Sequence, residues 1–113
     1  MWIFTQSGFV SAVRHWSQPD TLVVRSRDRD SLEDLAELLE VPIEKSPTND
    51  YPYRVHVEEK KFTEWLALSV ATLDYTNFKG RVHDMRGDDY ADALMEVWQT
   101  MHQVEDDEAR IRG

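Results

Sequence analysis

The chain has 113 residues and a formal net charge of -9, with 22 acidic residues against 13 lysines and arginines. A chain of this length forms a single domain whose core is large enough to fold without disulfides or bound metal. It contains no cysteine, which excludes disulfides, thiolate metal sites and thiol nucleophiles and is typical of the reducing cytoplasm. No apolar run approaches the roughly 20 residues that span a membrane, so we expect neither a membrane partner nor export.

Three short runs with the composition of β-strands occupy the first quarter of the chain. Residues 2 to 5 and 9 to 15 are rich in β-branched and aromatic residues, and a turn or bulge at Gly8 makes them two short strands or one bent strand. Residues 17 to 20 form a proline-containing turn, after which residues 21 to 27 resume the alternation of a strand. We therefore expect an antiparallel hairpin.

A helix and another strand follow the hairpin. Asp30 as N-cap, with Glu33 three positions later, predicts a helix over residues 31 to 40. Residues 41 to 52 contain three prolines and are expected to form a connector. Residues 53 to 58 alternate apolar with charged side chains, which predicts a third main strand.

Three helices are predicted after this strand. Residues 60 to 73 carry apolar side chains at helical spacing, so their helix is expected to cover the sheet. Asn77 is expected to cap a short helix that ends near Gly87, and Asp88 or Asp89 to cap a longer one. The longer helix carries apolar residues at three-and-four spacing, which predicts that they face the core. These residues are Tyr90, Leu94, Val97, Trp98, Met101 and Val104.

Together the elements predict an α+β domain over residues 1 to 104. We expect a small, mainly antiparallel sheet of three or four strands with three or four helices packed on one face, in the order ββ(β)αβααα. Residues 105 to 113 are mostly charged and are expected to form an acidic, frayed tail.

Strand alternation places cations together on one face of the predicted sheet. If Val24 and Val55 face the helices, the arginines and the histidine beside them emerge on the opposite side. Arg14 joins them if Val13 faces inward, and His15 takes its place in the opposite register. Guanidinium groups on such a face can grip carboxylates or phosphates with two parallel hydrogen bonds. The residues expected to bind an anion or a partner there are Arg14, Arg25, Arg27, Arg54 and His56.

Three other interpretations of this face stay open. The arginines could pair with nearby acids and form an ordinary solvated surface. With His56 they could hold an anionic small-molecule substrate, although no residue is assigned a catalytic role. Binding of RNA or single-stranded DNA would need aromatic rings between the cations, and Tyr53 shares the phase of the core-facing Val55. None of the four histidines has the i,i+4 partner of a metal site, so we expect no metal and no cofactor.

Two further sets of residues could contact a partner. Trp2 and Trp16 lie near turns in the strand region and are the candidate aromatic anchors. Carboxylates on the last helix could present a phosphate-like array to a nucleic-acid-binding protein, or could form an ordinary solvated side. This acidic partner face consists of Asp88, Asp89, Asp92 and Glu96.

Four short stretches carry a resemblance to known proteins: GFVSAV from residue 8, LVVRSR from residue 22, DYPYR from residue 50 and DYTNFK from residue 74. With them the chain, up to about residue 101, resembles a family of small hypothetical proteins of bacterial and phage genomes. That family has no established activity, so the resemblance implies a compact accessory protein and supplies no catalytic residues. It directs attention to Arg25, Arg27, Arg54, Asn77 and Lys79.

These observations favour a non-enzymatic binding module that engages a macromolecular partner, in the first place a protein, through the basic sheet face, the acidic helix or both. If the protein is encoded by a phage, we expect this module to inhibit the nucleic-acid machinery of the host, with the acidic helix mimicking nucleic acid. A small enzyme or binder of an anionic small molecule is the first alternative, and a nucleic-acid-binding sheet is the second. The net charge of -9 argues against nucleic acid, and the oligomeric state is left open.

Overall fold

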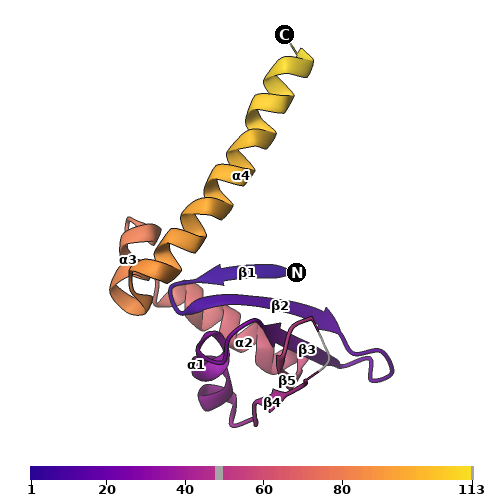
Figure 1. Ribbon diagram of the computed structural model, residues 1–113. Coiled ribbons are helices and arrows are strands. Elements are labelled where there is room, and N and C mark those ends of the chain that lie inside the picture. The colour runs from indigo at the N-terminus through magenta and orange to yellow at the C-terminus, as the bar shows by residue number, and fades with distance from the viewer. Residues whose placement is uncertain (48–49, 113) are drawn as a thin grey trace. The chain divides into compact units, whose positions relative to one another are not determined.

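The structure is a computed structural model that describes residues 1 to 47 and 50 to 112, with side chains described up to residue 105. Two compact units make up the chain, Met1–Asp74 and Tyr75–Gly113, which we name the sheet unit and the helical unit. The ribbon of each can be followed in Figure 1. The division falls inside the range of residues 1 to 104 that the sequence predicted as one domain, and the number of independently folding domains stays a prediction.

The sheet unit is a five-stranded antiparallel sheet with two helices, so the α+β class predicted from the sequence is confirmed. The strands lie in the order β1-β2-β3-β5-β4. The fifth strand, which exceeds the three or four expected, is a two-residue segment inside the predicted connector and is too short to show alternation. The elements are β1 (Trp2–Thr5), β2 (Gly8–Arg14), β3 (Thr21–Ser26), α1 (Asp30–Leu39), β4 (Glu44–Lys45), β5 (Tyr53–Glu58) and α2 (Glu59–Ala71).

Strand register decides which side chains enter the core. Val24 lies opposite both Ala12 and Val55, so these three side chains share one face of the sheet. Helices α1 and α2 pack on that face and contribute Leu35 and Trp65, among others, to one cluster. The buried members of the cluster are Val10, Ala12, Val24, Leu32, Leu35, Ala36, Val55, Val57, Phe62 and Trp65.

The start of α1 differs from the predicted capping box. The N-cap position is Arg29, which has helical backbone angles and makes no side-chain cap bond, while Asp30 is already inside the helix. The Ser31 hydroxyl instead donates to the Asp28 carboxylate just before the helix. The prediction of Asp30 as N-cap is therefore wrong, although the helix itself forms where it was expected.

The helical unit contains α3 (Phe78–Arg86) and α4 (Asp88–Arg112). The Asn77 side chain accepts a hydrogen bond from the Gly80 N–H at 3.2 Å, which confirms the predicted cap of α3. Gly87 has a φ of 89°, a left-handed conformation that favours glycine, and it separates the two helices. Helix α4 includes residues 105 to 112, where the sequence suggested a frayed tail.

The apolar stripe of α4 is exposed along most of its length. Val97, Trp98, Met101 and Val104 are between 40% and 60% exposed, so the prediction that they face a core is wrong. The reason is a difference in length, because α3 has 9 residues and α4 has 25. At about 1.5 Å per residue α3 can cover only the first part of its partner. No helix in the described part of the chain combines the length and the apolar character that crossing a bilayer requires.

Candidate binding site on the arginine face

The face of the sheet turned away from α1 and α2 carries the predicted cations. Ser11 lies opposite Arg25, and Arg25 lies opposite Arg54 on the next strand, so the three form one row across the sheet. Val23 lies opposite His56 in the neighbouring row. Because Val24 and Val55 enter the core, this row emerges on the other side. We name this side the arginine face.

Arg14 does not belong to the arginine face. It lies opposite Leu22, which packs against the core, and its guanidinium donates to Glu59 Oε1 at 2.6 Å and to the Pro19 carbonyl at 2.9 Å. His15 takes the place on the arginine face, where its ring lies 5.7 Å from that of His56. Of the two registers left open by the sequence, the structure therefore has the one that excludes Arg14.

Tyr51 holds the guanidinium groups of two arginines. The Arg25 and Arg27 guanidinium carbons lie 4.6 and 4.4 Å from the centroid of its ring, within the range of cation–π attraction. The ring also contacts Phe9 at 6.4 Å between centroids, and Tyr51 as a whole is only 6% exposed. The packing of this tyrosine fixes the arginines in place, so little side-chain freedom remains to be lost when they bind.

Arg25 and Arg54 form no ion pair among the described residues, although Glu44 on β4 lies opposite Arg54. Arg25 donates from Nη2 to Ser11 Oγ at 2.8 Å, and its buried Nε makes no hydrogen bond. Arg54 donates from Nε to the Tyr51 carbonyl at 3.4 Å. These two like charges lie directly opposite each other on adjacent strands, an arrangement that destabilises a sheet. An anion bound between them would remove this repulsion.

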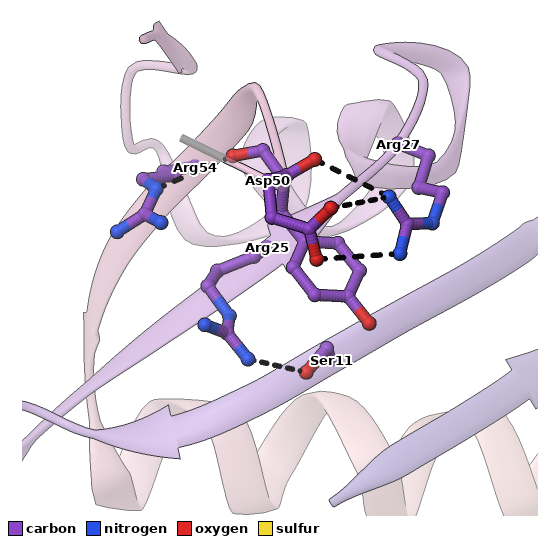
Figure 2. Close-up of polar contacts among 6 residues, drawn as sticks. Ser11, Arg25, Arg27, Asp50 and Arg54 are labelled. Carbon is purple, nitrogen blue, oxygen red and sulfur yellow. Dashed lines mark hydrogen bonds and ion pairs between the residues drawn. The ribbon is translucent and has the colours of Figure 1, made fainter. Parts of the chain in front are cut away.

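Arg27 differs from these two because it has a carboxylate partner. Its Nη1 lies 3.2 Å from Asp50 Oδ1, and Nη2 lies 3.4 Å from Oδ2. Figure 2 shows the Asp50 carboxylate turned toward Arg27, while Arg25 reaches toward Ser11. Arg54 points away from both other arginines (Figure 2). The hydrogen bond that Arg27 donates to the Asp50 carboxylate raises the pKa of Arg27 above its usual value. Arg27 is thus already neutralised within the chain, which leaves Arg25 and Arg54 as the cations available to a ligand.

Aromatic rings extend the arginine face across β1 and β2. Phe4 stacks on Phe9 with centroids 4.6 Å apart, and Trp2 meets Phe9 edge-on at 5.5 Å. Trp2 is 68% exposed, and Trp16 stacks on His15 at the tip of the β2–β3 hairpin and is 90% exposed. Both predicted anchors therefore have accessible rings. Phe4 shares a row with Phe9 but was not among the residues predicted for this face.

His56 lies on the arginine face but does not contact Arg25 or Arg54. Its Nδ1 lies 3.6 Å from Glu44 Oε2, and its ring neighbours that of His15. No contact in the described part of the chain joins it to Arg25 or Arg54, so the geometry does not bring an imidazole ring to the arginines. No group of three or more histidine and acidic side chains among the described residues is arranged to hold a metal ion.

The predicted acidic partner face lies along one side of α4. At about 100° per residue its four carboxylates fall within roughly a quarter of the helix circumference. Asp88 begins the helix and contacts His83 Nε2, whereas no ion pair is found for Asp92 or Glu96 within the described residues. The structure therefore leaves most of this acidic side exposed to solvent.

Comparison of the chain with protein-family models, with curated proteins and with solved structures found no match. The resemblance to small bacterial and phage proteins stays a prediction.

Proposed function

We propose that the protein is a binding module whose arginine face takes an acidic segment of a partner protein. The observation that carries the proposal is the pair Arg25 and Arg54, which lie opposite each other and form no ion pair with a described carboxylate. A partner carboxylate can accept two hydrogen bonds from a guanidinium and remove the repulsion between the two cations.

The rings beside the arginines support a protein partner. Tryptophan, tyrosine and arginine are the residues most enriched at the energetic centres of protein interfaces. Here Trp2 is largely exposed, and Tyr51 holds Arg25 in a fixed position. A partner segment with an acidic residue beside an apolar one would match both parts of the face.

Single-stranded nucleic acid is the second candidate for the same face. The specific observation that favours it is the alternation of rings and guanidinium groups, because bases stack on aromatic rings and arginines bind phosphates. The net charge of -9 weighs against it, since a polyanion is repelled at long range.

The acidic side of α4 supports a different role, as a modulator of a nucleic-acid-binding protein. Asp92 and Glu96 are one helical turn apart and exposed, so they present negative charge at a regular spacing to a basic partner. An inhibitor of phage type that mimics nucleic acid would use this surface and would leave the arginine face unoccupied.

Affinity capture from a lysate of the native host separates these roles. The bait is the full chain, compared with R25A/R54A and with K60A/K61A, which removes the same charge from exposed positions on α2. A protein captured by the wild type and by K60A/K61A, lost with R25A/R54A and retained after nuclease treatment, supports the proposal.

Each other outcome of the capture points elsewhere. Capture that nuclease abolishes would assign the arginine face to nucleic acid. Capture that R25A/R54A leaves unchanged but D92N/E96Q removes would assign function to α4. Equal capture by all variants would exclude both surfaces as the binding site.

A further inference from the structure

The exposed apolar stripe of α4 follows a seven-residue repeat. Leu94, Val97, Met101 and Val104 are separated by three, four and three residues, and Tyr90 precedes Leu94 by four. This spacing is that of the a and d positions of a coiled coil, whose side chains form one seam when a second helix lies alongside.

Helix α3 does not cover this seam beyond its start. Lys79 of α3 reaches Met95, and Arg86 stacks on the Tyr90 ring with its guanidinium carbon 4.0 Å from the centroid. From Val97 onward the seam is exposed, and Trp98 beside it stacks on His102 with centroids 5.4 Å apart. Two full turns of apolar side chains are therefore available to a partner helix.

The positions that flank the seam carry no charge until its last turn. Between Tyr90 and Val104 these flanking residues are alanine, threonine and tryptophan, namely Ala91, Ala93, Trp98 and Thr100. Charged partners choose one another through such flanking positions, so this seam offers a basic or acidic helix nothing to recognise. Asp88, Asp89, Asp92 and Glu96 lie on the side of α4 away from the seam, so between Tyr90 and Val104 two copies can approach without like charges meeting, despite a net charge of -9 on each. The first charge beside the seam is Glu105.

We propose that α4 pairs with α4 of a second copy of this chain through Leu94, Val97, Met101 and Val104. A second copy satisfies the repeat automatically, because each layer of the seam meets a layer of the same spacing. It also matches the neutral flanks, which a charged partner would not. This inference rests on α4 alone and does not depend on what binds the arginine face.

Sedimentation equilibrium of the full chain tests the proposal. We expect a dimer at micromolar concentrations and a dissociation constant at least tenfold higher in V97E/M101E, because the substitutions place carboxylates in the seam. The matched control is Q99E/Q103E, which adds the same two charges to the side of α4 that carries Asp92 and Glu96 and should leave the dimer intact.

Circular dichroism at 222 nm checks that each variant stays helical, and V97T/M101Q replaces V97E/M101E if the charges unfold α4. A wild-type protein that stays monomeric at about 100 μM would overturn the proposal. The proposal would also be overturned if Q99E/Q103E weakened the dimer as much as V97E/M101E does, or if neither V97E/M101E nor V97T/M101Q weakened it. In either case the contact would lie elsewhere.

Discussion

The sheet unit and the helical unit use the same kind of apolar pattern with opposite results. In the sheet unit the apolar side chains of α1 and α2 meet those of the sheet, and Leu35 and Trp65 are buried. In α4 a stripe of equal regularity stays exposed, because α3 is too short to cover it. Periodicity thus predicts which side of a helix is apolar, while the length of the neighbouring elements decides whether that side is covered.

The largest expected effect on the free energy of unfolding comes from truncating a leucine of the sheet unit, and it is compared with truncation of a methionine of the helical unit. L35A removes a fully buried side chain and should lower the free energy of unfolding by about 2 to 5 kcal/mol. M101A truncates an exposed side chain and should change it by less than about 0.5 kcal/mol in a monomer. Urea denaturation followed by circular dichroism, at a concentration below any dimer, gives both values. A large loss with M101A would show that α4 is covered within one chain.

A smaller effect is expected from the cap of α3. N77A removes the acceptor for the Gly80 N–H and should destabilise the helical unit by about 1 kcal/mol. Hydrogen exchange should show faster exchange of the amides in α3 and the start of α4, with β2, β3 and β5 unchanged. Equal acceleration in both units would mean that they unfold together, as one domain.

The smallest expected effect concerns the two opposed arginines. Like charges directly opposite on adjacent strands repel, so the coupling between Arg25 and Arg54 should be unfavourable by about 0.2 to 1 kcal/mol. A double-mutant cycle of R25A, R54A and the double variant measures this coupling from urea denaturation. R54A alone should be close to neutral, and added salt should shrink the coupling. A favourable coupling would mean that the two side chains support each other and are not held ready for an anion.

Much of the sheet unit could be predicted from the sequence because its signals are local. The strands, the turn at Pro19 and the core-facing valines follow from alternation and turn chemistry. The register of β2 could not be predicted, because Val10 and Ala12 on one side of the strand are about as apolar as Phe9 and Val13 on the other. The hairpin pairing of Arg14 with Leu22 decides between them, and it places His15 on the arginine face.

The parts of the site that could not be predicted from the sequence depend on contacts between distant residues. Tyr51 belongs to a proline-rich connector, and only the folded chain brings its ring against Arg25 and Phe9. Asp50 likewise neutralises Arg27 across a separation of 23 residues, which no local pattern reveals. Strand phase was enough to place the three arginines on one face. It could not predict which of them would lack a carboxylate partner.

The most direct test of the central claim is nuclear magnetic resonance of the arginine Nε–Hε groups during titration with a short acidic peptide that contains tryptophan. Our account predicts that the Arg25 and Arg54 signals shift together and saturate, while the signals of Arg27, held by Asp50, and of Arg14, held by Glu59, move little. Equal, unsaturated shifts of all four arginines, or no shift of Arg25 and Arg54, would contradict it.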